Sequence, residues 1–160
     1  MSAEVTSSTD ELAELADLRR RLGALEDERA ITATMQRYAE SLDYGDRDAW
    51  AATFTSDGLF DVRRRGQPMF SHTGTEALAA FAATHTSAPA VYHKHFLSTS
   101  AIELNGDSAV ARTYFTMLHE RDTGPIVLVF GRYLDDLVRQ DDRWLFQKRV
   151  VDMEALPPVG

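Results

Sequence analysis

The chain has 160 residues, of which 44% are hydrophobic and 26% are charged, and a formal net charge of −8 at pH 7, which is the composition of a single globular domain. The acidic balance argues against a nucleic-acid partner, because such binding relies on clustered Lys and Arg, and the absence of cysteine excludes disulfides, thiolate metal sites and a cysteine nucleophile. No run approaches the roughly 18 apolar residues of a membrane span, and the polar start lacks a secretory signal, so we expect a cytoplasmic protein without a membrane partner.

The first predicted element is an amphipathic helix. Residues 1–7 are predicted to be disordered, and Ser8-Thr-Asp-Glu11 has the form of a capping box that would begin the helix. Five leucines follow at steps of three and four residues: Leu12, Leu15, Leu18, Leu22 and Leu25. Gly23 either separates this helix from the next one or only weakens the join. Two heptads are too few to require a coiled coil, so packing on the chain's own domain and packing on a second subunit both stay open.

The next predicted helix carries a tyrosine on its buried side. Ile31, Met35, Tyr38 and Leu42 recur at i, i+4, i+7 and i+11, which is one face of a helix. Gly45 is expected to end this helix, because glycine tolerates the left-handed conformation that follows a last turn. Tyr38 is therefore predicted to point inward, where its hydroxyl needs a hydrogen-bond partner.

The rest of the chain is predicted to form two short helices and then a series of strands. Asp46 can cap a short helix that runs through Phe54, and Thr73-Gly-Thr-Glu76 is a second capping box. Asn105-Gly106 is a strong signal for a tight hairpin. A predicted strand begins at Leu59 and runs to a turn at Gly66-Gln-Pro68, and the other predicted strands are residues 69–72, 91–104, 108–120, 126–139 and 143–152. Helices followed by an antiparallel sheet form the α+β pattern, and a sheet that curls against helices encloses a pocket.

Two of the five histidines lie two positions apart on one predicted strand. His93 and His95 therefore point to the same face, unless a bulge intervenes. Paired histidines hold a metal when a carboxylate and a third histidine converge on them, but the glycine-rich surroundings of a metal-binding barrel are missing, so we predict no metal. Two interpretations remain: a neutral acid/base group in a pocket, and an inert histidine with a structural hydrogen bond.

Several short motifs follow one another from about residue 27 to 152. In chain order they are Tyr38-Ala-x-x-x-Asp43, Trp50, Phe54-Thr-x-Asp57-Gly, His95 seven residues before Ile102, Asn105-Gly-Asp107-x-Ala109, Gly131-x-Tyr133-x-Asp135 and Trp144-x-x-x-x-Arg149. Their order and spacing resemble the nuclear transport factor 2-like superfamily, and within it the SnoaL-like group, which includes scytalone dehydratase and bile acid 7α-dehydratase. The resemblance implies an α+β cone of the cystatin-like type, a curved antiparallel sheet closed by helices around a deep apolar cavity.

This resemblance also suggests how the chain is divided and where its site lies. Residues 27–153 would form the cone, preceded by a disordered start and amphipathic helix in residues 1–26 and followed by an extended tail in residues 154–160. The catalytic tyrosine, aspartate, histidine and arginine of the dehydratases match Tyr38, Asp43, His95 and Arg149. A further acidic residue or histidine would fall on the next strand, where plain pairing about the Asn-Gly turn favours His119 over Glu120 and a single bulge would reverse the choice.

Asp43 can reach the cavity only under one geometric condition. Five residues along an α-helix rotate by about 500°, a net 140°, so Asp43 would not share the face of Tyr38 in a continuous helix. We therefore expect Asp43 to reach the cavity only if the helix has ended by Leu42. The simpler alternatives are a turn residue for Asp43, an inert buried phenol for Tyr38 and an ordinary ion-paired or surface residue for Arg149.

The predicted chemistry is elimination of water, or a related proton shift, on an apolar small molecule that carries a carbonyl group, without a metal or an organic cofactor. His95 would remove the proton next to the carbonyl, Tyr38 would hydrogen-bond the developing enolate or the departing hydroxyl, and Asp43 would orient one of them. The same cone supports isomerases, polyketide cyclases, epoxide hydrolases and non-catalytic binding or subunit-assembly modules, so these stay as alternatives.

The predicted sheet also suggests self-association. Alternating apolar positions such as Val127, Val129 and Leu134 would give its outer face an apolar character. A second copy is the usual cover for such a face, so we predict a homo-oligomer, either a dimer or a trimer.

Overall fold

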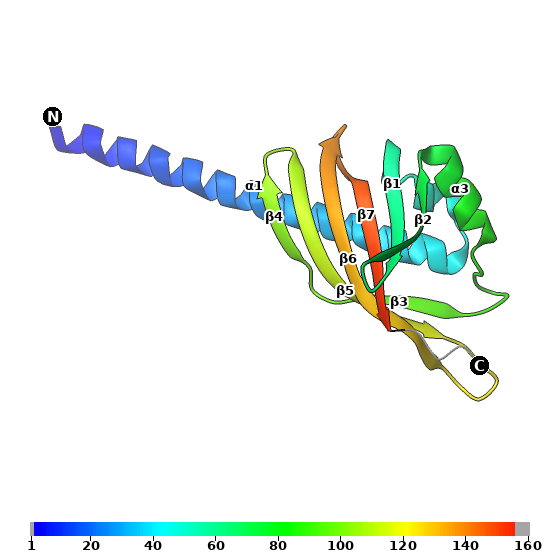
Figure 1. Ribbon diagram of the computed structural model, residues 1–160. Helices are drawn as coiled ribbons and strands as arrows, with labels where there is room; N and C mark the ends of the chain where they lie inside the picture. The colour runs from blue at the N-terminus through cyan, green and yellow to red at the C-terminus, as the bar shows by residue number, and fades with distance from the viewer. Residues whose placement is uncertain (1, 156–160) are drawn as a thin grey trace.

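The computed structural model describes residues 2–155 and consists of three helices and a curved sheet (Figure 1). The elements are α1 (Ser2–Tyr44), α2 (Arg47–Ala51), β1 (Phe54–Arg64), β2 (Gln67–Thr73), α3 (Thr75–Thr84), β3 (His93–Leu97), β4 (Ala101–Asn105), β5 (Ser108–His119), β6 (Ile126–Gln140) and β7 (Arg143–Ala155). No helix in this range combines the length and apolar character that a membrane crossing requires. Most of the predicted tail, residues 156–160, lies outside the described part of the chain.

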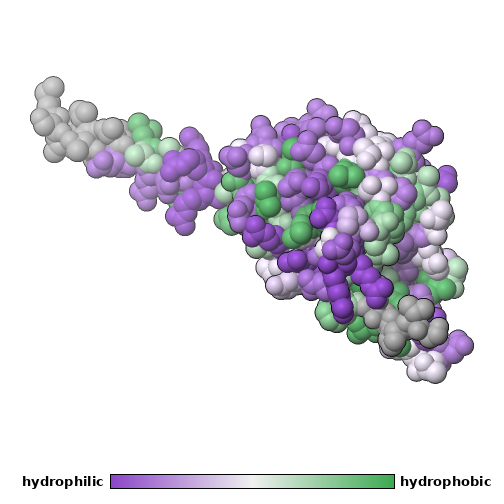
Figure 2. Space-filling view, in the orientation of Figure 1, coloured by the Kyte–Doolittle hydropathy of each residue, from purple (hydrophilic) through white to green (hydrophobic). Residues whose placement is uncertain are grey.

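Helix α1 is one continuous helix rather than two. It begins at Ser2, before the capping box at Ser8, and it passes through Gly23 without a break. The predicted inward stripe is confirmed, because Ile31, Met35, Tyr38 and Leu42 are all buried. The N-terminal half of the helix extends beyond the edge of the sheet, and hydrophobic residues are exposed on this projecting part (Figures 1 and 2).

The sheet has seven strands in the order β2-β1-β7-β6-β5-β3, and β4 also pairs with β5. It is mixed rather than wholly antiparallel, because β1 and β7 run parallel to each other. The Asn105-Gly106 turn joins β4 to β5, with Asn105 opposite Ser108. The long strand predicted over residues 91–104 is two strands, β3 and β4, and the register against β5 changes by one residue between them.

Two predicted boundaries differ in the structure. Asp46 caps α2 as expected, with its side chain accepting from Ala49 N at 3.0 Å, but α2 ends at Ala51 and β1 already begins at Phe54. Helix α3 begins after Gly74 without a side-chain cap, so the predicted capping box at Thr73 does not form. Gly74 has a φ of +83°, a conformation that glycine adopts without strain, and it therefore serves as the entry to α3.

The core lies between the helices and the concave face of the sheet, which confirms the predicted α+β cone. Its centre is a group of aromatic rings from α1, α2, β1, β6 and β7: Tyr38, Trp50, Phe54, Phe60, Tyr133 and Phe146. The odd positions from Ala109 to Phe115 on β5 and from Val129 to Leu137 on β6 point into this core, so Val129 is 5% exposed and belongs to the inner face, not to the outer face where it was expected. Val127 is exposed, as predicted. The exposed apolar side chains of the outer face include Val110, Tyr114 and Phe130. Self-association through this face stays a prediction.

Candidate active site

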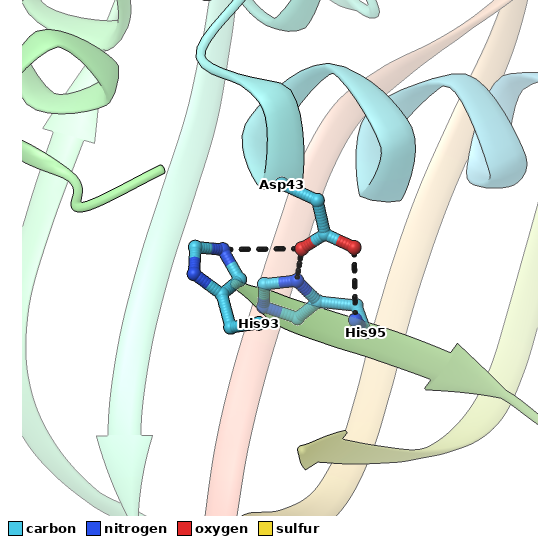
Figure 3. A group of neighbouring side chains, drawn as sticks. All are labelled: Asp43, His93 and His95. Carbon is cyan, nitrogen blue, oxygen red and sulfur yellow. Dashed lines mark hydrogen bonds and ion pairs between the residues drawn. The ribbon is translucent and has the colours of Figure 1, made fainter. Parts of the chain in front are cut away.

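A buried carboxylate and two histidines meet where the end of α1 crosses β3 (Figure 3). Asp43 accepts two hydrogen bonds from His95, from the ring Nδ1 at 2.6 Å and from the backbone N at 3.1 Å. The Nε2 atom of His93 lies 3.1 Å from the Asp43 oxygen that His95 Nδ1 contacts. All three side chains are at most 8% exposed, so solvent does not screen these contacts.

The position of Asp43 corrects the condition expected from the sequence. Helix α1 does not end at Leu42 but continues to Tyr44, and Asp43 is still buried. The reason is that β3 packs on a different flank of α1 from the one that faces the aromatic core. A rotation of about 140° from Tyr38 points Asp43 at this flank. The backbone carbonyl of Asp43 also accepts from Ala88 N at 3.1 Å, which holds the segment before β3 against the helix end.

The contacts around Asp43 favour its charged form. Burial would raise the pKa of Asp43, but the close contact with His93 Nε2 and the hydrogen bonds from His95 outweigh it and hold the pKa well below its usual range. Because a carboxylate only accepts hydrogen bonds, His95 Nδ1 must carry the proton, which leaves Nε2 of the same ring as an acceptor. His93 Nε2 has no aligned hydrogen-bond partner despite its short distance to Asp43. The arrangement thus holds one imidazole in the orientation and tautomer of a general base.

Two further histidines extend this group. The ring of His85 lies 4.9 Å from that of His93, and burial lowers the pKa of His85 from 6.5 to about 4. His93 and His119 are opposite each other across β3 and β5, so His119 shares the face of His93. This pairing depends on the one-residue register shift between β3 and β4, because the register of the β4–β5 hairpin, continued to β3, would put Glu120 opposite His93. A pocket of about 330 Å³ lies at this end of the sheet, and His93, Lys94 and His119 are part of its lining.

Tyr38 and Arg149 lie in a second group, inside the aromatic core. The Tyr38 ring is 2% exposed, and Arg149 is fully buried and hydrogen-bonds Asp135 through two nitrogens at 2.8 and 2.7 Å. The Arg149 guanidinium also lies 4.2 Å from the centres of the Tyr38 and Tyr133 rings. Burial raises the pKa of Tyr38 to about 12, although Arg149 opposes the rise, so the phenol is a hydrogen-bond donor at neutral pH and not a base.

The two groups are adjacent but not joined by direct contacts. Within residues 2–155, no ring contact links Tyr38 with His95, and Tyr38 does not line the pocket beside His93 and His119. Tyr133 belongs to the Tyr38 group, with its ring centre 5.9 Å from that of Tyr38, and burial raises the pKa of Tyr133 well above its usual value. The structure therefore brings Asp43 together with His95, and Tyr38 together with Arg149.

Asp43, His93 and His95 are also the residues that could hold a metal ion, because their ligand atoms lie within 4.8 Å of one another. Two ligands of one tetrahedral zinc ion are about 3.4 Å apart, given zinc–ligand distances near 2.1 Å. The 2.6 Å between His95 Nδ1 and the Asp43 carboxylate is the length of a charge-assisted hydrogen bond. The geometry therefore favours an acid/base pair over a metal centre.

Two members of these groups were not among the predicted site residues. His85 follows α3 in a segment without periodicity, so nothing in the sequence links it with β3. Asp135 had a usable signal, because it is a charged residue at an inward position of a strand whose neighbouring inward positions hold the buried Val129, Tyr133 and Leu137. A charge at such a position needs a buried partner, and Arg149 on the neighbouring strand lies directly opposite.

Comparison with known proteins agrees with this architecture. The family model described as a SnoaL-like domain matches residues 23–150, whereas the curated proteins contain no match. A protein of unknown function from Mycobacterium tuberculosis is 28% identical, with a TM-score of 0.74 over 86% of this chain and 79% of that one. A nuclear transport factor 2-like protein with a cystatin-like fold from Novosphingobium aromaticivorans is 24% identical, with a TM-score of 0.76 over 91% and 92%. A candidate scytalone dehydratase from the same organism is 23% identical, with a TM-score of 0.70 over 86% and 90%. The last two establish the fold alone.

Proposed function

The chain belongs to the SnoaL-like family, and on this premise we propose that it catalyses a cofactor-independent proton transfer, such as a dehydration, on a small apolar molecule that carries a carbonyl group. One observation carries the proposal: the Asp43 carboxylate accepts from His95 Nδ1 at 2.6 Å in a buried position. A fixed, oriented imidazole next to a carboxylate is the basic unit of acid/base catalysis by histidine.

In this proposal His95 is the base. Its Nε2 accepts the proton next to the substrate carbonyl, and the imidazolium that forms is stabilised by the charge of Asp43. Asp43 is a positioning residue, because it contacts the histidines and not the substrate. After the proton has been removed, the same imidazolium can return it to a departing hydroxyl group, so that one histidine serves both halves of a dehydration.

Other residues would contribute binding and polarisation. The pocket of about 330 Å³ beside His93 and His119 is the proposed substrate site, where Leu118 and Pro125 would contact the apolar part of a substrate and Lys94, Glu120 and Arg121 add charge to the lining. His95 does not line this pocket and would reach the substrate from its position two residues beyond His93 on β3. Tyr38 keeps its proposed role as donor to the substrate oxygen, which agrees with a phenol that stays protonated at neutral pH. That role requires the aromatic core to open toward the pocket when substrate binds.

The structure disfavours one alternative more than the others. An epoxide hydrolase needs a water-activating aspartate that works together with an arginine, and the sequence offered Asp43 and Arg149 for these roles. Arg149 instead pairs with Asp135, and Asp43 pairs with histidines. Isomerases and polyketide cyclases use the same proton abstraction as a dehydratase, so they differ from it in substrate and not in this site.

The test is deuterium exchange, because it detects proton abstraction before the overall reaction is known. A panel of small β-hydroxyketones would be incubated in D₂O with the wild type and with His95→Gln, and incorporation next to the carbonyl would be followed by NMR. We expect exchange to slow by roughly 10²- to 10⁴-fold in His95→Gln. The matched control is His72→Gln, since His72 lies on β2 outside the group and should exchange at the wild-type rate.

Two results would count against the proposal. Ligand binding without exchange in the wild type would identify a binding module, which is the main alternative from another functional class. Equal exchange in the wild type and His95→Gln would remove His95 from the role of base. Tyr38→Phe is a separate probe, and a loss of exchange with unchanged ligand affinity would place the phenol in the transition state.

A further inference from the structure

The projecting half of α1 carries an uncovered apolar stripe. Leu15, Leu18, Leu22 and Leu25 are between 48% and 63% exposed, and the N-terminal part of α1 extends beyond the body of the protein (Figure 1). By contrast, the apolar side chains Ile31, Met35 and Leu42 on the same helix are at most 4% exposed. A contiguous exposed apolar surface of this kind marks a contact with another molecule.

The stripe faces away from the protein's own core. A helix turns by about 100° per residue, so these leucines lie between about 110° and 190° from the centre of the buried stripe around Tyr38. The observed contacts agree with this rotation. Asp27 lies on the side toward the sheet and accepts from Trp144 Nε1 at 2.9 Å and from Arg139 at 3.2 Å. The chain's own domain therefore reaches only the last of the four leucines, Leu25, which lines a cleft between α1 and the residues that join β3 to β4.

The spacing of the stripe matches a short coiled coil. Leu15 and Leu22 are seven residues apart, as are Leu18 and Leu25, so the four leucines occupy the first and fourth positions of two consecutive heptads. Gly23 follows Leu22 and falls on the outer side of such a pair, where a missing side chain leaves no gap between the helices. The segment can thus pair with another helix that has the same spacing.

Charged residues beside the leucines identify the partner and its direction. With the leucines at heptad positions a and d, a residue at position g of one helix lies next to the residue at position e of the following heptad on the other helix, five positions later in the sequence, when the two helices are parallel and in register. In two copies of this chain, Glu14 would meet Arg19 of the second copy, and Arg21 would meet Glu26 of the second copy. All four residues are exposed, and both contacts join opposite charges.

Antiparallel pairing of the same leucines is disfavoured by the same charges. With Leu15 opposite Leu25 of a second copy, Arg21 would lie next to its own equivalent and Glu14 would lie next to Glu28. Both contacts join like charges. We therefore propose that two copies of this chain associate through residues 12–28 of α1 as a parallel two-helix coiled coil. The cones then lie on the outside of the pair, because the stripe and the buried face of α1 point in nearly opposite directions.

The first test is the mass of the full-length protein in solution. We expect sedimentation equilibrium at micromolar concentrations to show an assembly of at least twice the 17.9 kDa chain, and Leu18→Glu with Leu22→Glu to halve its mass. The matched control is Ala13→Glu with Ala16→Glu, which adds the same charge to exposed positions away from the stripe and should leave the mass unchanged. Fluorescence of the buried Trp50 and Trp144 would verify that the cone of each variant is folded.

The second test is the direction of the pair. The chain has no cysteine, so Leu15→Cys introduces a single thiol. In the parallel pair the two thiols face each other and form a disulfide on oxidation, whereas in antiparallel pairing they would be about 15 Å apart. Arg19→Glu should weaken the parallel pair by several-fold, and adding Glu14→Arg should restore it.

Three outcomes would overturn the proposal. A wild-type protein that sediments as a single chain at every concentration excludes association. A leucine variant with the wild-type mass places the interface elsewhere, for example on the outer face of the sheet. A dimer that Leu15→Cys does not cross-link excludes the parallel arrangement.

Discussion

The buried ion pair between Arg149 and Asp135 offers the sharpest test of how the interior is built. Arg149→Met removes a charge that is 0% exposed and leaves Asp135 buried without its two hydrogen bonds, at 2.8 and 2.7 Å. Burial raises the pKa of Asp135, although the nearby charge of Arg149 lowers it. Burial lowers the pKa of Arg149, but the charge of Asp135 outweighs burial, so the pKa of Arg149 is raised. The two aligned hydrogen bonds indicate that both groups are ionised, so Arg149→Met leaves the negative charge of Asp135 buried without a partner.

The expected loss is about 3–5 kcal/mol of unfolding free energy, because removal of one partner from a buried pair leaves the other uncompensated. This is a large part of the roughly 5–15 kcal/mol that stabilises a domain. Asp135→Leu together with Arg149→Met should recover at least about 2 kcal/mol of the loss, since apolar residues replace both charges. The control is Arg63→Met, where the pair with Asp61 is partly exposed and should contribute less than about 1 kcal/mol.

Urea unfolding followed by tryptophan fluorescence measures these differences, because Trp50 and Trp144 are 0% and 2% exposed and change environment on unfolding. The reasoning would be wrong if Arg149→Met stayed within about 1 kcal/mol of the wild type, or if the double variant were no more stable than the single one. A stable double variant that had lost activity would instead give Arg149 a catalytic role beyond its structural one.

Two glycines and one histidine allow further predictions. Gly131→Ala should lower the unfolding free energy by more than about 2 kcal/mol, because the added Cβ would collide with the backbone carbonyl of Asp152 on β7. Gly23→Ala should raise it by up to about 1 kcal/mol, since the site in α1 is open and alanine is the better helix former; urea unfolding checks both. Burial lowers the pKa of His85 from 6.5 to about 4. Between these pH values the unfolded chain therefore binds a proton at His85 that the folded chain does not bind. His85 consequently does not reduce the unfolding free energy above pH 6.5, and it reduces that free energy increasingly as the pH falls toward 4. His85→Gln should therefore make the stability less dependent on pH in this range, and urea titrations at pH 7 and pH 4.5 would show whether it does.

The parts of the fold that the sequence predicted well are those set by local periodicity. The spacing of Ile31, Met35 and Tyr38 can be satisfied only by a helix with one buried face, and that face is buried. Asn105-Gly106 favours a turn with positive φ, and a turn forms there, with Gly106 at φ +59°. The family resemblance supplied the curvature and the closure by helices, which periodicity alone does not contain.

The parts that failed depend on contacts between distant segments. The parallel pairing of β1 with β7 joins residues more than eighty positions apart, and no local pattern specifies it. The sequence also did not specify how the candidate site residues are arranged in space. Sequence reasoning placed Tyr38 and His95 across one cavity because it treated α1 as having a single functional face. It did not foresee that β3 would cover another flank of α1, where Asp43 points.

Helix α1 explains why the proposed site and the proposed interface can be studied separately. At its C-terminal end, the side turned away from the core is covered by β3 through Asp43 and His95. At its N-terminal half, nothing in residues 2–155 covers the corresponding side, and the leucines are exposed there. About 18 residues of helix, or roughly 27 Å, separate Leu25 from Asp43. Substitutions this far apart that share no partners should have additive effects on stability, so Leu18→Glu combined with His95→Gln should show the sum of the two single losses. A departure from additivity would mean that pairing of the helices alters the site, and the dimer rather than the single chain would then be the functional unit.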